Sequence, residues 1–460
     1  MGKLIMWNLV TLDGFFEGPD KWSLDWHDIA WGDELQELSL SQLRSAAMLL
    51  FGRVTYQGMA SYWPTAKGQT ANLMNSLLVL GPAGSLDPSF GSNGLAAEPV
   101  DSNMDDAIAL MQLADGSVLV GGPATPAGDE AVLVRFTSEG ALDQSFGNGG
   151  WIQIPFDGAG IDATGAIRFG QQSDGKIVLA IGSDTGDIAL ARVTADGQMD
   201  PSFANGGIVD VQIAGGLLIA VESIAIGAGD EIIVAMATGT SGAELTLVRF
   251  TPDGVKDLGF AGGRLDVDRG TSHRASLMSV LEDGSVLVNG SAYETDPPNI
   301  PFLMRVTTTG SVDASFGDAG VLVIESGFRM ALVEGDGAIL VAGVVDGQAV
   351  FRRLTPAGES DTSFGTDGEQ VIPLPSGFAG SLVGFLSGPA GLITVGRPDV
   401  TVMRFDLGDG RLDRAFGDDG TATVAIDDIS AKQVVRQGDG RILVLADEDV
   451  FPFLLARFFE

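Results

Sequence analysis

The sequence predicts a mainly β protein, a seven-bladed β-propeller of four-stranded blades, preceded by a short α/β segment. Three observations predict this architecture. A six-residue motif built around Asp and Phe occurs seven times, the same succession of apolar runs and Gly turns accompanies each copy, and the composition changes near residue 80. Four-stranded units that recur about every 50 residues are typical of blades arranged around an axis.

The composition divides the 460 residues into two differently built parts. Residues 1–80 contain five of the six Trp and carry a net charge of −3, whereas residues 81–460 hold 58 of the 65 Gly and a net charge of −32. We therefore expect a partial α/β segment at 1–78, a junction at 79–85 and the propeller at 86–460.

The repeated motif reads Leu-Asp-Pro-Ser-Phe-Gly at 86–91, and every later copy keeps the Asp and the Phe. Successive copies are 48 to 57 residues apart. Seven units suit a closed ring, which protects sheet edges. A solenoid is the competing architecture, but its repeats are usually shorter. The motif phenylalanines are Phe90, Phe146, Phe203, Phe260, Phe316, Phe364 and Phe416.

Each repeat predicts four short strands in a fixed order. An alternating run follows the motif, as at 151–154, and a half-apolar run follows it, as at 107–113. An Asp-Gly turn such as 115–116 then opens a β-branched run, because Gly and Asp tolerate the positive φ of hairpin turns. A fourth run, as at 133–136, leads to the next motif. We expect the last blade to end on its fourth strand at 454–459.

The first 78 residues predict a β–α–β–α order. The apolar run 4–10 predicts a buried strand, the leucine stripe over 33–48 a helix, and 48–51 a second strand, after which Gly52 opens another helix. Residues 77–85 align with the last run of a repeat, which makes them a candidate strand for closing the ring.

The charge and the missing cysteines exclude several classes of function. With 26 basic and 61 acidic side chains, the net charge of −35 argues against nucleic acid and anionic membranes as partners. Without Cys there is no disulfide, thiol nucleophile or thiolate metal site. No run of 18 apolar residues predicts a spanning helix, and the first residues do not fit a secretory signal, so a cytoplasmic location is the default expectation.

One Arg and one Asp recur at a spacing of eight or nine residues, and their repetition indicates a structural role rather than one catalytic cluster. We expect the Asp to accept backbone N–H groups in the turn before Ser-Phe-Gly. The Arg would brace that turn or the neighbouring blade, and the Phe would pack between blades. The Arg set is Arg135, Arg192, Arg249, Arg305, Arg353, Arg404 and Arg457; the Asp set is Asp87, Asp143, Asp200, Asp257, Asp313, Asp361 and Asp413.

No catalytic residue and no metal ligand is predicted. The acidic loops do not show the spacing of a calcium loop, so solvated surface charge is the favoured interpretation. The only His in the propeller part, His273, lies in a polar stretch that predicts a loop. A calcium-stabilised surface protein remains an alternative.

The repeats resemble the delta-60 repeat of bacterial propeller proteins over nearly all of 81–460. The segments that carry the resemblance are Asp-Gly followed by an apolar run, Leu-x-Arg-Phe, and Leu-Asp-x-Ser-Phe-Gly. The resemblance implies the fold, and a family that is mostly secreted or surface-associated without an assigned activity.

The N-terminal part resembles the dihydrofolate-reductase-like reductases related to riboflavin biosynthesis. The resemblance rests on Thr-Leu-Asp-Gly-Phe at 11–15, Leu-Asp-Trp-His at 24–27, Leu-Arg-Ser-Ala at 43–46, Gly-Arg-Val-Thr-Tyr at 52–56 and Ala-Ser-Tyr-Trp-Pro at 60–64. It implies that Gly52, Arg53 and Thr55 contact NADPH at a helix N-terminus, with Asp13 near the substrate cleft. The resemblance ends near residue 76, so the later half of such a domain is missing.

These features favour a non-enzymatic, acidic scaffold that needs no cofactor and binds an unidentified protein or carbohydrate partner. An NADPH-dependent reductase acting through the N-terminal segment is the alternative from a different class.

Overall fold

A computed structural model describes most of the chain. The described residues are 32–45, 48–50, 78–80, 83–97, 104, 107–124, 130–156, 167–182, 187–204, 206–212, 220–238, 244–267, 272–293, 300–325, 327–374, 382–388, 391–396, 400–406, 411–424, 429–447 and 453–460. Within them, no helix is long and apolar enough to cross a membrane.

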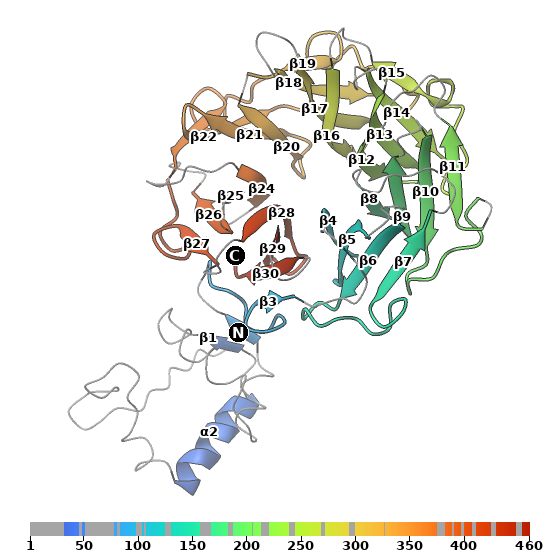
Figure 1. Cartoon of the computed structure of the whole chain (residues 1–460). Helices are drawn as coiled ribbons and strands as arrows, with labels where there is room; N and C mark the ends of the chain where they lie inside the picture. Colours follow the sequence, from blue (N-terminus) through green and yellow to red (C-terminus); the bar gives the residue numbers. More distant parts are fainter. Residues whose placement is uncertain are drawn as a thin grey trace.

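Seven four-stranded sheets stand around a common axis (Figure 1). Six of them, here called the first to sixth blades, are each made of four strands that follow one another in the chain. The first three blades comprise β4 (Ala109–Gln112), β5 (Val118–Pro123), β6 (Glu130–Phe136), β7 (Trp151–Pro155); β8 (Arg168–Gln171), β9 (Ile177–Gly182), β10 (Asp187–Val193), β11 (Ile208–Gln212); and β12 (Ala220–Ile226), β13 (Ile232–Thr238), β14 (Glu244–Phe250), β15 (Leu265–Val267).

The fourth to sixth blades repeat this order. They comprise β16 (Ser272–Val280), β17 (Val286–Tyr293), β18 (Ile300–Val306), β19 (Val321–Val323); β20 (Phe328–Val333), β21 (Ile339–Val345), β22 (Gln348–Leu354), β23 (Glu369–Pro373); and β24 (Leu382–Gly388), β25 (Gly391–Gly396), β26 (Thr401–Phe405), β27 (Thr421–Thr423).

The seventh sheet, here called the closing sheet, takes its strands from both ends of the ring. Three come from the C-terminal end, and the outermost, β3, comes from the N-terminal side of the first blade. The strands are β28 (Ser430–Arg436), β29 (Ile442–Asp447), β30 (Leu454–Phe458) and β3 (Leu95–Ala96).

The prediction of seven blades, each folded from one repeat, is therefore wrong: six blades are contiguous in sequence, and the last sheet is composite. The strand after each Phe-Gly motif is the outermost strand of the blade that precedes it, not the first strand of a new blade. The run at 454–458 is accordingly a third strand. Because the first motif copy has no preceding blade of its own, its strand β3 pairs with the open edge of β30.

The closing sheet reproduces the hydrogen bonds of a contiguous blade with residues from the two ends. In the first blade, the Asp143 amide donates to the Arg135 carbonyl at 2.9 Å. In the closing sheet, the Asp87 amide donates to the Arg457 carbonyl at 2.8 Å. The inner strands also meet, because the Gln433 side chain bonds both the N–H and the C=O of Leu110 in β4. The ring is thus closed on itself.

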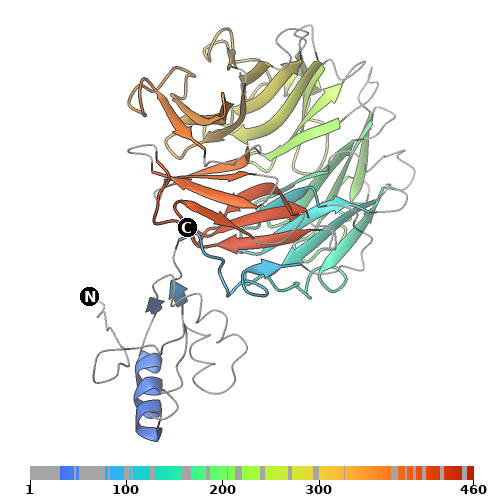
Figure 2. The same ribbon diagram turned by 60° about the vertical axis from the view of Figure 1, so that its left-hand side comes forward.

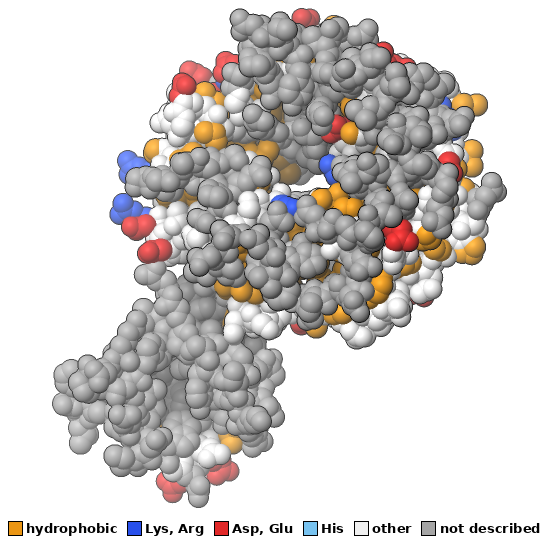
Figure 3. All heavy atoms as spheres, viewed as in Figure 1, with side chains coloured by type: hydrophobic (Ala, Val, Ile, Leu, Met, Phe, Trp, Pro, Cys, Tyr) orange, Lys and Arg blue, Asp and Glu red, His pale blue; other side chains and the backbone are white. Residues whose placement is uncertain are grey.

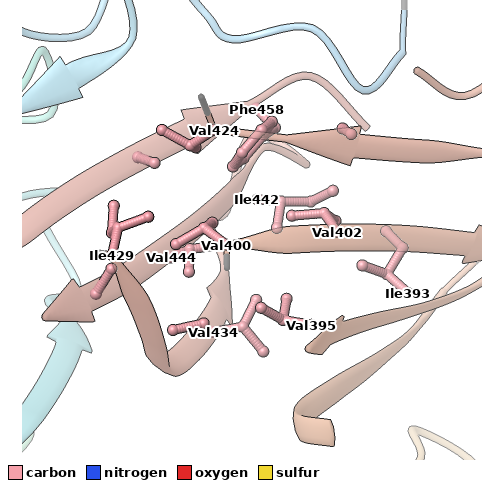
Figure 4. Packing of buried hydrophobic residues seen from close by; sticks show 14 of the residues in the cluster. Ile393, Val395, Val400, Val402, Val424, Ile429, Val434, Ile442, Val444 and Phe458 are labelled. Atoms are coloured by element: carbon pink, nitrogen blue, oxygen red, sulfur yellow. The ribbon is translucent and has the colours of Figure 1, made fainter. Parts of the chain in front are cut away.

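The apolar runs of the repeats become strands that are buried between neighbouring sheets. Every residue of β9 is buried, as a strand packed on both faces requires. Side chains from adjacent sheets share one core, and Figure 4 shows Val395 and Val402 of the sixth blade with Ile442, Val444 and Phe458 of the closing sheet. The core of the ring is therefore a series of layers between sheets.

The Asp-Gly hairpins form as the sequence predicts. Between β4 and β5, the Leu113 amide donates to the Ser117 carbonyl at 2.8 Å, and the Asp115 carboxylate accepts the Ser117 amide at 2.9 Å. Gly116 has a φ of +86°, a left-handed value that a side chain disfavours.

Part of the N-terminal segment is described, beyond the closing sheet in Figure 2. Helix α2 (Asp33–Ser45) and strand β1 (Met48–Leu50) confirm the predicted helix and second strand. Strand β2 (Leu78–Leu80) pairs in parallel with β1, so these three residues do not close the ring as the alignment of 77–85 suggested. The strand predicted at 4–10 and the helix predicted from Gly52 lie outside the described residues.

Candidate functional site

In five of the seven sheets, the recurring Arg joins a turn of its own blade to the next blade, an arrangement here called the latch. In the second blade, Arg192 Nε donates to Asp200 Oδ2 at 2.8 Å, and its Nη1 donates to the Pro252 carbonyl of the third blade at 2.7 Å. Asp200 also accepts the amide and the hydroxyl of Ser202 at 3.0 and 2.6 Å. The guanidinium carbon lies 4.7 Å from the centre of the Phe203 ring. The expected bracing role is confirmed.

The same latch recurs around the ring. Four further recurring Arg donate Nη1 to a backbone carbonyl of the following repeat: Arg135 to Ala195 at 2.5 Å, Arg249 to Thr308 at 2.6 Å, Arg305 to Pro356 at 2.8 Å and Arg457 to Ser138 at 2.5 Å. Six motif phenylalanines are fully buried beneath the latches: Phe90, Phe146, Phe203, Phe260, Phe316 and Phe416.

Each buried Phe rests on a glycine of the next blade. Gly254 has a φ of +80°, and a Cβ built there would lie 2.5 Å from the ring of Phe203. The turn at Gly254 thus approaches the ring as closely as only glycine permits. The Phe is the packing contact between blades that the repeat predicts.

The ionised latch carboxylate is strongly favoured in the second blade. Burial alone would raise the pKa of Asp200, but the hydrogen bonds from Ser202 and the charges of Arg192 and Lys176 outweigh it and lower the pKa to about 2. Such a carboxylate is a structural acceptor near neutral pH and not a proton donor.

The closing latch is built from both ends of the chain. Asp87, which is 1% exposed, lies 2.8 Å from Arg457 Nη2 and 2.5 Å from Arg441 Nε. It also accepts the amide and the hydroxyl of Ser89 at 3.0 and 2.7 Å. The Arg457 guanidinium lies 4.6 Å from the Phe90 ring centre. The charges that close the ring are therefore buried and paired.

The fifth blade departs from the pattern. Arg353 donates Nε to Glu334 at 2.6 Å and contacts the carboxylates of Asp336 and Asp361. The hydrogen bond that Arg353 donates to Glu334, with those it donates to the two Asp, raises the pKa of Arg353. Phe364, the Phe of this repeat, is only half-buried.

A second departure lies one residue earlier, at Arg352. In other sheets, the residue before the recurring Arg is apolar and pairs across to the outer strand, as in Val134–Trp151, Ala191–Ile208, Met304–Val321, Met403–Thr421 and Ala456–Leu95. In the fifth blade the equivalent pair is Arg352–Glu369. Among the six cross-strand pairs named here, the pair of the fifth blade is therefore the one that is an ion pair, and the other five are uncharged.

The Arg352–Glu369 pair lines a groove between the fourth and fifth blades. Arg352 Nη2 lies 2.7 Å from Glu369 Oε2 and 3.3 Å from Glu325 Oε2, and its guanidinium carbon lies 5.2 Å from the ring centre of the buried Phe328. The groove has a volume of about 410 Å³. Its lining residues are Leu322, Val323 and Ile324 of the fourth blade and Val341, Arg352, Leu354, Gly358, Ser360, Thr366, Asp367 and Glu369 of the fifth.

Acidic (red) and apolar (orange) side chains are both visible at the upper left of Figure 3, on the side of the fifth blade. In the groove, the apolar residues Leu322, Ile324 and Leu354 are half-buried or buried, whereas Asp367 and Thr366 are exposed. The arrangement offers an apolar floor and a polar border, which is the chemistry of a binding site.

The residues that the sequence singled out for cofactor binding, Gly52, Arg53 and Thr55, lie outside the described residues, as does Asp13. His273 lies in β16, where it pairs with Ala292, so the predicted loop is wrong at this position. Pairing with β17 overrides the polar composition of the stretch. Within the described ranges, no three His, Asp or Glu side chains are grouped to hold a metal ion.

Arg352 and Glu369 are not among the residues that the sequence singled out. The sequence does contain a signal for Arg352, because it is a charged residue at a position that is apolar in the other repeats. The residues at that position in the other repeats are Val134, Ala191, Val248, Met304, Met403 and Ala456. The signal is seen only when the repeats are compared at the position before the recurring Arg.

A family model for a β-propeller domain of unknown function, DUF5122, matches residues 113–146, 172–203 and 281–316. Each match begins just before the hairpin turn between the first two strands of a blade and ends on the motif Phe. No curated protein matches the chain in sequence.

Among solved structures, puromycin hydrolase is 15% identical with a TM-score of 0.47, over 80% of this chain and 53% of that one. This chain therefore corresponds to about half of the hydrolase. The Dos1 propeller is 10% identical with a TM-score of 0.43, over 79% and 82% of the two chains. The β-propeller domain of the Trilobed protease from Pyrococcus furiosus, described as having an open velcro topology, is 10% identical with a TM-score of 0.40, over 77% and 94%.

Similarities of this size assign no activity and no ligand to the chain. The three matches to the family model coincide with the first, second and fourth blades, where the sheets have the radial order described above. The described ring is a β-propeller.

Proposed function

We propose that this propeller is a non-enzymatic, acidic scaffold that binds a protein or carbohydrate partner at the groove between the fourth and fifth blades. One observation carries the proposal: the Arg352–Glu369 ion pair stands where the other sheets named above have uncharged cross-strand pairs, and it lines the groove. The other blades fold without an ion pair at this position. A contact with a partner outside the blade therefore explains the Arg352–Glu369 pair better than a need of the blade itself.

The remaining recurring charges support binding rather than catalysis. The recurring Arg and Asp are committed to one another in the latches, as in the pair formed by Arg305 Nε and Asp313 Oδ2 at 2.7 Å. A group held in such a pair is not poised for proton transfer.

The experiment exchanges the ion pair for the pair of the sixth blade. The double variant Arg352→Met, Glu369→Thr reproduces Met403–Thr421, which the same fold already accommodates. We expect its melting temperature to stay close to that of the wild type, because replacing a partly buried ion pair by well-packed neutral groups is often neutral.

The full chain and the double variant are screened against a glycan array and a phage-displayed random peptide library. Ligands that bind the wild type and are lost from the folded double variant support the proposal. A ligand that binds both equally refutes the groove as the site, and two screens without any ligand contradict the binding function itself.

A further inference from the structure

The groove between the fourth and fifth blades also indicates what kind of partner it takes, an inference that rests on the proposed binding function. We propose that it docks a basic segment of a protein partner. An apolar side chain of the segment occupies the groove, and Lys or Arg side chains beside it meet Glu325 and Asp367.

The apolar part of the groove is open at one wall. Its floor is formed by Val341 and Leu354, which are almost fully buried, together with Ile324. Val323 lines the wall and is 60% exposed. Covering Val323 and filling the floor would remove apolar surface from water, which favours association.

The charged part of the groove is left with an excess of carboxylates. Arg352 is already engaged by Glu369 and Glu325, and the Glu325 side chain is still 71% exposed. The Asp367 carboxylate forms no ion pair or hydrogen bond with another described residue, while its turn is fixed by the hydrogen bond from Ser360 Oγ to the Asp367 carbonyl at 3.0 Å. The groove lining and the adjacent Glu325 therefore contribute three carboxylates but only one guanidinium.

The charge of the whole chain selects among possible occupants. A net charge of −35 repels a second copy of this chain and other acidic proteins, and it speeds the approach of a basic segment. A neutral carbohydrate could donate hydroxyl hydrogen bonds to the carboxylates, but it would leave their excess negative charge unneutralised. The basic, partly apolar segment fits both halves of the groove.

The probe is a short synthetic peptide that alternates lysine with leucine, labelled with fluorescein and titrated with the full chain while anisotropy is recorded. A second peptide carries glutamate in place of lysine. We expect saturable binding of the lysine peptide that weakens with added salt, and no binding of the glutamate peptide.

Two matched pairs of variants locate the binding. Val323→Lys is compared with Val255→Lys, because these side chains are 60% and 62% exposed and only Val323 lines the groove. Asp367→Asn is compared with Asp346→Asn, because both are exposed turn residues of the fifth blade with left-handed φ of +54° and +50°. We expect about tenfold weaker binding for Val323→Lys, about threefold weaker binding for Asp367→Asn, and little change in the two controls.

Each remaining outcome overturns the proposal. These outcomes are no binding at millimolar peptide, equal binding of the two peptides, or equal effects of the groove variants and their controls. Sedimentation that shows a dimer dispersed by Val323→Lys would assign the groove to a second copy. A glycan that binds the wild type but not Arg352→Met, Glu369→Thr would keep the binding function and refute only the basic segment.

Discussion

Replacing Asp87 by Asn tests whether the closing latch holds the N-terminal strand on the ring. The carboxylate is 1% exposed and faces Arg457 and Arg441 at 2.8 and 2.5 Å. Removing one partner of a buried ion pair costs about 3–5 kcal/mol, because the remaining charge is left without compensation. Since Asn keeps an oxygen for the Ser89 amide, we expect the lower end of this range.

The matched control is Asp200→Asn in the second blade. Asp200 is 4% exposed and makes the same bonds to Arg192 and Ser202, but there the turn is part of a continuous chain. We expect both variants to lower the free energy of unfolding by a similar amount in a urea titration.

Hydrogen exchange distinguishes the two variants. In Asp87→Asn the strand at 95–96 and its turn should open without the rest of the ring. A loss of about 3 kcal/mol corresponds to exchange roughly 100-fold faster at the amides of Gly84, Asp87 and Phe459, which bond across the seam. Unchanged exchange at these amides in Asp87→Asn, or equal acceleration in Asp200→Asn, would refute the closing role.

Three further outcomes are expected. The pKa of Asp200 falls from 3.8 to about 2 on folding, so its ionised form contributes about 2 kcal/mol to the free energy of unfolding above pH 4, and this contribution is lost as the pH falls through 2. In urea titrations, Asp200→Asn should therefore lower the free energy of unfolding more at pH 7 than at pH 3. Equal losses at the two pH values would contradict this. Gly254→Ala should lower the free energy of unfolding by roughly 1–3 kcal/mol more than Gly347→Ala, since both glycines have a left-handed φ but only Gly254 lies against the aromatic ring of Phe203. Equal losses would show that the Phe203 side chain moves to accommodate the added methyl group. EDTA should leave the melting temperature unchanged, because within the described ranges no three His, Asp or Glu side chains are grouped to hold a metal ion; a fall would favour the calcium alternative.

The latches were predictable because their residues recur. A spacing of eight residues between Arg192 and Asp200 returns in other repeats, and repetition alone indicated that the pair is structural. The hairpin at Asp115-Gly116 and helix α2 were predictable from local turn chemistry and apolar spacing.

The limits of a blade were not predictable in the same way. A periodic sequence has no marked beginning, so the run after each motif is equally compatible with an inner or an outer strand. Only the pairing of β3 with β30 shows at which strand each blade begins and ends. That pairing joins residues such as Leu95 and Ala456, which lie far apart in the chain. The groove was missed for a related reason, because Arg352 is informative through its departure from the repeat and not through the repeat itself.

The composite closing sheet also sets the order in which the chain can be completed during synthesis. Ser89 and Arg457, which bond across the seam at 2.9 Å, are separated by 368 residues. At ordinary elongation rates this interval lasts roughly 20 to 70 s. Each contiguous blade has its own four strands as soon as they are made, whereas Phe90 and β3 wait for residues 443–458, which cover Phe90 and pair with β3. The core layer around Phe90 is therefore completed only after the six contiguous blades have been made.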